Sequence, residues 1–125
     1  YENIEFIPHQ DNEKLVEYQM SADLLFYSIT KEVDTYWCCS PMKIFEYMAT
    51  GVPILGSNIG SISEVLNPSN SIIFDPENQK TIGSGFRYFT NNRVESKKKS
   101  DAALLEVRHF YTWSVRAKSI LEFIK

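Results

Sequence analysis

A lysine and a glutamate stand three residues apart in the segment Ser-Pro-Met-Lys-Ile-Phe-Glu-Tyr-Met-Ala, residues 40–49. Ser40 followed by Pro41 predicts the start of a helix, because serine caps a helix N-terminus and proline fits its first position. The free N–H groups of such an end attract an anion such as a phosphate. Lys43 would neutralise that phosphate, and Glu46, on the same helix face, would accept hydrogen bonds from sugar hydroxyls. The spacing thus indicates a nucleotide-recognition pair, and the alternative interpretation is an ordinary solvated ion pair.

These residues need a scaffold, and the hydrophobic pattern predicts a parallel α/β sheet. Residues 22–29 form a nearly continuous apolar run, which is typical of a strand buried on both faces. Three shorter strands are predicted at residues 4–7, 52–55 and 71–74. Helices are expected at 12–20, 40–50 and 61–66, over about fifteen residues after Pro76, at 94–110, and from Thr112 onward. This order predicts a Rossmann-like parallel sheet flanked by helices, with further C-terminal helices.

Ligands of such sheets bind at the carboxyl ends of the strands. Three segments are expected there: His9–Asn12, Thr30–Lys43 and Gly56–Glu64. The loop at 30–39 is long for a connection between a strand and a helix, and such loops are often functional. Its Tyr36 and Trp37 either line a sugar pocket or cover the edge of the core. His9 alone favours an ordinary surface-loop histidine.

Composition narrows the function classes. The 125 residues indicate one domain, and 13 Lys and Arg against 16 Asp and Glu give a net charge of −3, which argues against a nucleic-acid partner. No apolar run is long enough to predict a transmembrane segment. The adjacent Cys38 and Cys39 are expected to be reduced thiols, as in the cytoplasm. No metal site is expected, because His9 and His109 are far from the cysteines in sequence.

Residues 40–57 resemble the donor-binding signature of group 1 glycosyltransferases of the family 4 type. Four further stretches resemble that family in the same order, at residues 21–23, 57–65, 71–76 and 111–114. The resemblance implies a retaining enzyme of the GT-B fold, of which this chain would form a partial C-terminal domain. Such an enzyme moves a sugar from a UDP-, GDP- or similar nucleotide-sugar to a glycan, lipid or other acceptor, as in polysaccharide biosynthesis. It implies no cofactor and no metal.

The resemblance also implies roles for individual residues. The turn that meets the diphosphate and donor sugar corresponds to Ser40, Pro41, Met42 and Lys43. Glu46 corresponds to the glutamate that holds the ribose, and Lys43 to the group that stabilises the departing diphosphate. The first glutamate of the family's E-x7-E motif falls on Cys38, which carries no carboxylate. We hypothesise that acidic residues of the preceding loop replace it, so that the candidate sugar contacts are Glu32, Asp34, Cys38 and Cys39.

The resemblance to this family implies that the 125 residues are part of a longer protein. Residues 1–125 are expected to form one domain, the distal part of the donor-binding domain of a longer cytoplasmic chain with peripheral membrane contact at the inner face. The acceptor domain and the base-stacking residues would precede Tyr1, so the isolated chain is expected to be inactive. Two alternatives remain open: a nucleotide-sugar 2-epimerase-like enzyme, and a non-catalytic nucleotide-sugar-binding or regulatory domain. A response-receiver domain is excluded, because no acidic pair follows the first predicted strand.

Overall fold

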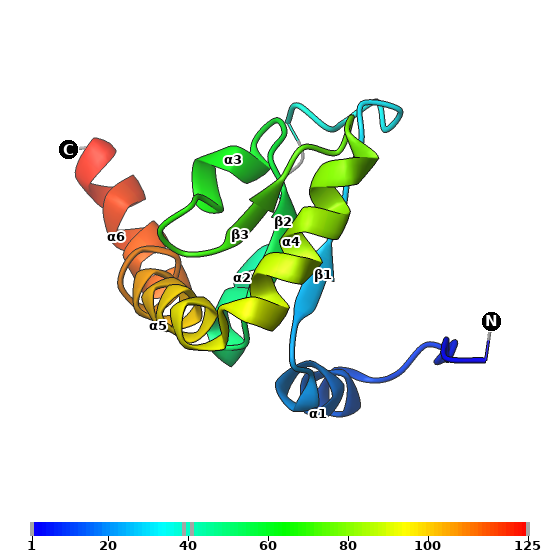
Figure 1. The fold of residues 1–125 in the computed structure, drawn as a ribbon. Coiled ribbons are helices and arrows are strands. Elements are labelled where there is room, and N and C mark those ends of the chain that lie inside the picture. The colour runs from blue at the N-terminus through cyan, green and yellow to red at the C-terminus, as the bar shows by residue number, and fades with distance from the viewer. Residues whose placement is uncertain (1, 39, 41, 125) are drawn as a thin grey trace.

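The chain is seen in a computed structural model that describes residues 2–38, 40 and 42–124. Within these residues three parallel strands form one sheet in the order β1-β2-β3. They are β1 (Leu25–Tyr27), β2 (Ile54–Ser57) and β3 (Ile72–Phe74). Helices lie on both faces of the sheet (Figure 1). This confirms the predicted α/β class with a parallel sheet.

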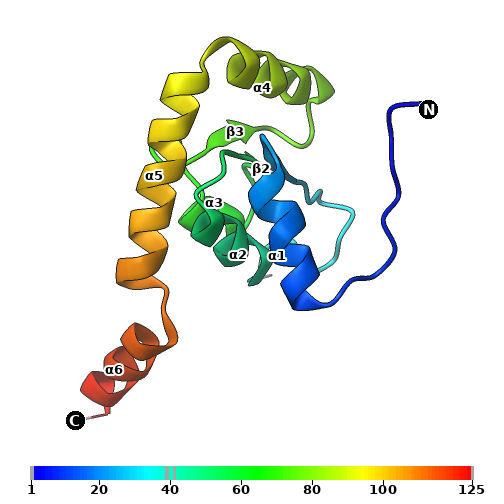
Figure 2. The ribbon, with the colours of Figure 1, turned by 90° about the horizontal axis from the view of Figure 1, so that it is seen from below.

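The helices alternate with the strands and then follow one another at the C-terminal end. In the described part of the chain they are α1 (Asn12–Ser21), α2 (Met42–Thr50), α3 (Ile62–Val65), α4 (Gln79–Asn91), α5 (Arg93–Phe110) and α6 (Trp113–Phe123). Helix α4 packs on one face of the sheet, and α2, α3 and α5 pack on the other. Helix α1 contacts α2, as Figure 2 shows from below. No described helix is both long enough and apolar enough to cross a membrane.

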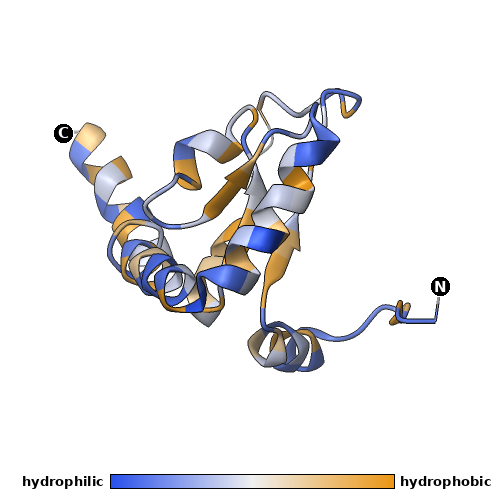
Figure 3. Cartoon of the chain, in the orientation of Figure 1, coloured by the Kyte–Doolittle hydropathy of each residue, from blue (hydrophilic) through white to orange (hydrophobic). Residues whose placement is uncertain are grey.

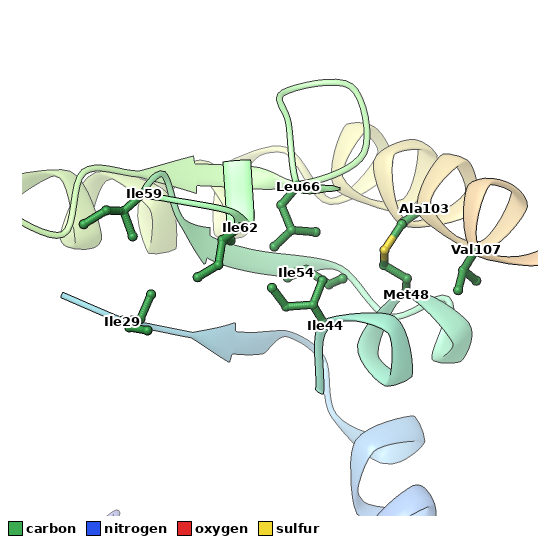
Figure 4. Close-up of a cluster of buried hydrophobic side chains, with 9 residues drawn as sticks. All are labelled: Ile29, Ile44, Met48, Ile54, Ile59, Ile62, Leu66, Ala103 and Val107. Carbon is green, nitrogen blue, oxygen red and sulfur yellow. The ribbon is translucent and has the colours of Figure 1, made fainter. Parts of the chain in front are cut away.

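The larger hydrophobic cluster fixes α2 against the sheet. Ile44 and Met48 of α2 are fully buried and face Ile54 of β2 (Figure 4). Helix α5 buries the small side chains Ser96, Ser100 and Ala103, and Ala103 lies next to Met48 in the same view. Burial of such side chains contributes about 1.5–3 kcal/mol each. These buried contacts therefore hold α2 in place, and with it the first turn that carries the candidate site.

The smaller cluster lies between the sheet and α4. Gly85 allows this contact, because a Cβ there would lie 2.5 Å from Leu55 Cδ1. Phe26 of β1 stacks on Phe74 with ring centroids 5.4 Å apart, yet 42% of it is exposed. The predicted burial of this strand on both faces is therefore wrong at Phe26. The reason is that α4 packs over β3 and leaves β1 partly uncovered on that side.

Three predicted strands differ from the structure. The apolar run at residues 22–29 forms a strand only over Leu25–Tyr27. Residues 4–7 form no strand, and Ile4, Phe6 and Ile7 are exposed in a segment that extends from α1 (Figure 1). A strand needs a hydrogen-bonded neighbour, and none of the described strands pairs with this segment. Strand β2 begins two residues later than predicted and includes Gly56. A Cβ at Gly56 would lie 2.6 Å from Leu66 Cδ1, so this glycine serves close packing and does not end the strand.

The residues that mark the ends of helices agree with the structure better than the strand patterns do. Gly51 follows α2 with a φ of +68°, the left-handed conformation expected of a glycine after a helix. The side chains of Asp11 and Thr112 cap α1 and α6, because they accept hydrogen bonds from the backbone N–H of Lys14 and Val115. The predicted proline start of α2 lies outside the described residues. Helix α6 has no buried residue among those described, and its large apolar side chains are exposed. Figure 3 shows that apolar and polar residues alternate along this helix.

Candidate functional site

The carboxyl ends of the three strands are tied together by hydrogen bonds. The backbone N–H of Ile29, just after β1, donates to Ser57 Oγ at the end of β2 over 3.2 Å. The N–H of Asn58 donates to the carbonyl of Phe74 at the end of β3 over 2.8 Å. The loops that follow β1 and β2 thus begin from one fixed edge. This is the edge at which the sequence predicted a ligand site.

Gly60 brings the loop at 30–38 against the turn after β2. Its φ is +53°, and a Cβ there would lie 2.0 Å from the carbonyl oxygen of Tyr36. Only glycine permits both the conformation and this approach. Tyr36 packs against the larger core cluster, whereas Trp37 is 67% exposed. Of the two interpretations given for these aromatic residues, covering the core edge describes Tyr36, and Trp37 keeps a free ring.

Lys43 and Glu46 form an ion pair with 3.5 Å between Nζ and Oε2. Their side chains are 39% and 47% exposed, so solvent screens the pair and a ligand can reach both groups. Such a pair is worth only about 0.3–0.5 kcal/mol, and a bound anion can displace it. Next to it, burial raises the pKa of the Tyr47 phenol above its usual value, and the Glu46 charge acts in the same direction.

The ion pair lies in the wall of a hollow of about 460 Å³. The other walls come from the segment before α1 and from α1 itself. The residues around the hollow are Ile7, Pro8, His9, Gln10, Asn12, Leu15, Tyr18, Lys43 and Glu46. The segment His9–Asn12 and the Lys43–Glu46 pair are therefore brought together in this hollow. The prediction that His9–Asn12 follows a strand is wrong, because residues 4–7 form none. Sequence reasoning missed Leu15 and Tyr18, although their spacing places both on one helical face.

Ser40 and Met42 lie on the other side of the start of α2. They line a second hollow with an aromatic wall and one cation, made with Phe45, Phe110, Tyr111, Thr112, Trp113 and Arg116. The rings of Phe45 and Tyr111 lie 5.0 Å apart there. The sequence expected one cradle from Ser40 through Lys43. The structure divides that turn between two hollows, and Pro41 lies outside the described residues.

The remaining candidates are more scattered. Glu32 and Asp34 are exposed in the loop at 30–38 and line neither hollow. Cys38 is a free, exposed thiol, and Cys39 lies outside the described residues. Among the residues that the structure describes, no group of three or more His, Cys, Asp or Glu side chains could hold a metal ion. His109 is on α5, where its Nδ1 lies 2.7 Å from the carbonyl oxygen of Leu105.

Comparison with known proteins agrees with this arrangement. The family described as glycosyl transferases group 1 matches residues 1–106. Among solved structures, sucrose-phosphate synthase from Thermosynechococcus elongatus superposes with a TM-score of 0.80 at 16% sequence identity, which establishes a shared fold. The match covers 98% of this chain and 30% of the synthase chain. A search of curated protein sequences gave no match. Since the family match spans most of the sequence, the chain belongs to the group 1 glycosyl transferases and forms part of a GT-B domain.

Proposed function

We propose that this chain supplies the donor nucleotide-sugar site of a retaining glycosyltransferase. The observation that carries the proposal is the hollow in which Lys43 and Glu46 lie 3.5 Å apart, between the start of α2, the segment before α1 and α1 itself. A cation and a carboxylate at that separation suit the two parts of a nucleotide that lie next to each other, the phosphates and the ribose. The family membership supports the same assignment.

The chemistry follows from the two charges. The Lys43 ammonium is a compact cation that exchanges its contact with Glu46 for a phosphate oxygen. In the reaction it stabilises the negative charge that develops on the departing diphosphate. The Glu46 carboxylate, released from the ion pair, accepts hydrogen bonds from the ribose hydroxyls. These residues supply the charge stabilisation themselves, and we propose a reaction without a metal cofactor.

The acceptor site is proposed to lie in another part of a longer protein. The chain spans 30% of the synthase with which it shares its fold. We propose that residues 1–125 bind the donor but do not transfer the sugar alone. Glu32 and Asp34, on the loop that Gly60 holds in place, are the proposed contacts of the donor sugar. The exposed thiol of Cys38 suits a reducing compartment, and we propose the cytoplasm.

Calorimetry of the chain with UDP and GDP tests the assignment of each charge. Lys43→Ala should remove the advantage of UDP over uridine, because the diphosphate loses its cation. Glu46→Ala should remove the advantage of a ribonucleotide over its 2′-deoxy counterpart. A hydrogen bond to a charged group contributes about 1.5–3 kcal/mol, so each loss should be about 10-fold to 150-fold in affinity.

The chain offers a matched control on α5. Glu95 and Lys98 form another exposed pair three residues apart, with 3.2 Å between Nζ and Oε2. Lys98→Ala and Glu95→Ala should leave nucleotide affinity unchanged. Equal losses in the α2 and α5 variants would mean that general charge, and not this hollow, attracts the nucleotide. No binding of UDP or GDP to the unmodified chain would contradict the proposed donor site.

A further inference from the structure

We infer that the outer edge of β3 binds an extended peptide segment of a partner protein, in which an acidic residue stands between two apolar residues. Among the described strands, β3 pairs only with β2, so its other edge is open. Figure 2 shows β3 in the angle between α4 and α5. Residues of these three elements line a hollow of about 460 Å³ along the open edge, separate from the proposed donor site.

The backbone of Ile73 directs both of its hydrogen-bonding groups to this edge. The Phe74 carbonyl accepts a hydrogen bond from the N–H of Asn58, just after β2, over 2.8 Å, so the backbone groups of Phe74 face β2. Successive residues of a strand direct these groups to opposite sides, so those of Ile73 face away from β2. Half-buried backbone groups are nearly always paired, and an added strand would supply the partners.

The open stretch is short, because the residues on either side of Ile73 are already paired on this edge. The N–H of Ser71 donates to the carbonyl of Asn67 over 2.9 Å. The N–H of Asp75 donates to Thr81 Oγ1 over 3.0 Å, and the same hydroxyl donates to the Asp75 carbonyl over 2.8 Å. The edge therefore fits an extended peptide of a few residues, centred beside Ile73.

The two faces of the sheet determine which side chains such a peptide must carry. Ile73 packs against the larger cluster, on the face covered by α5, whereas Ile72 and Phe74 belong to the cluster under α4. Neighbouring residues of paired strands point to the same face. The peptide residue beside Ile73 therefore points toward α5, and the residues before and after it point toward α4. On α4 the hollow is lined by Gly85 and the ring of Tyr88, which suit apolar side chains.

The α5 side of the hollow carries a cation without an acidic partner. Lys97 and Lys98 each pair with a carboxylate of α5. Lys99 is half-buried and donates to the Pro68 carbonyl, and no described carboxylate lies within ion-pair distance of it. It is the one charged side chain among the described residues around the hollow, and its ammonium has two donors left. An acidic residue fits this position, whereas a second copy of the chain would bring its own Lys99 there and be repelled.

An NMR titration of the 125-residue chain tests the inference with the peptide threonine-valine-glutamate-valine-threonine, capped at both ends. The amide of Ile73 should shift and exchange its hydrogen more slowly, while the amides of Ile72 and Phe74, which face β2, should change less. Lys99→Ala should weaken the peptide about twofold to fivefold, as expected for an exposed ion pair, and Lys99→Arg should restore the affinity. The same peptide methylated at every amide nitrogen should not bind, because it cannot donate to the edge.

Lys98→Ala is the matched control, because it removes the same charge from α5 outside the hollow and should leave the peptide affinity unchanged. Equal losses in Lys98→Ala and Lys99→Ala would overturn the acidic contact. No binding at millimolar peptide, or binding that leaves the Ile73 amide unchanged, would overturn the inference. So would protection of that amide that rises with protein concentration in the absence of peptide, because a second copy would then occupy the edge. Lys99→Ala should leave UDP binding intact, so this result and that of the donor site are independent.

Discussion

Replacement of Gly60 by alanine tests how the loop at 30–38 is held at the carboxyl ends of the strands. At this residue φ is +53°, and an added Cβ would lie 2.0 Å from the Tyr36 carbonyl oxygen and 3.0 Å from the Trp37 Cα. The left-handed conformation alone costs an alanine about 1–2 kcal/mol. The clash is with backbone, so the loop at 30–38 must move, and overpacking of this kind adds about 1–3 kcal/mol. We expect a total loss of about 2–5 kcal/mol in the free energy of unfolding.

Gly51→Ala is the matched control for this measurement. Gly51 has a similar φ of +68°, but its added Cβ would only touch the flexible Leu104 Cδ2 at 3.3 Å. Gly51→Ala should therefore lower the free energy of unfolding only by the cost of the left-handed conformation, about 1–2 kcal/mol. Urea unfolding at constant pH measures both values, and the difference between them isolates the loop contact. If the two variants lost the same stability within about 0.5 kcal/mol, the close packing of the loop on Gly60 would be refuted.

Two further predictions concern one buried and one half-buried polar group, Asn70 and Tyr47. Asn70 is fully buried, and its Nδ2 donates to the Val65 carbonyl and to Glu106 Oε2, each over 2.8 Å. Asn70→Ala should therefore cost about 1–3 kcal/mol in urea unfolding, and a loss below about 0.5 kcal/mol would show that the links are not formed. Burial raises the pKa of Tyr47 in the folded chain above the ordinary tyrosine value near 10. As the pH rises, the Tyr47 phenol therefore loses its proton in the unfolded chain before it does so in the folded chain. The free energy of unfolding consequently falls from about pH 10 until the pH passes the pKa of the folded chain. Tyr47→Phe should therefore show a smaller drop in urea midpoint between pH 8 and pH 10.5, and equal drops in both proteins would contradict the assignment.

Much of the fold was predictable because its signals are local. The caps at Asp11 and Thr112 and the glycine after α2 need only neighbouring residues to act. Residues 4–7 carry an alternating pattern like that of a strand, yet a strand forms only where another strand pairs with it. The burial of Phe26 depended in the same way on what covers β1. Such outcomes depend on contacts that are distant in sequence, which a local pattern does not contain.

In the candidate site, too, the local contacts could be predicted from the sequence and the contacts between distant residues could not. Helical spacing predicted that Lys43 and Glu46 share a face, and they form an ion pair. Successive helical residues point about 100° apart. Met42 and Lys43 therefore line different hollows, whereas the family resemblance assigns both to one turn. The approach of His9 to this pair depends on the packing of α1 against α2. No spacing rule indicates that contact, and the sequence alone favoured an isolated surface histidine.

The most direct test of the donor site is an NMR titration of the chain with UDP, following each backbone amide. We expect the largest shifts at the amides of Lys43 and Glu46 and of His9, Gln10 and Asn12, which line the hollow with the ion pair. The hollow beside Tyr88 and Lys99, at the far side of β3, should remain unchanged. Unchanged amides at Lys43 and Glu46, or largest shifts at Tyr88 and Lys99, would contradict the assignment of this hollow to the nucleotide.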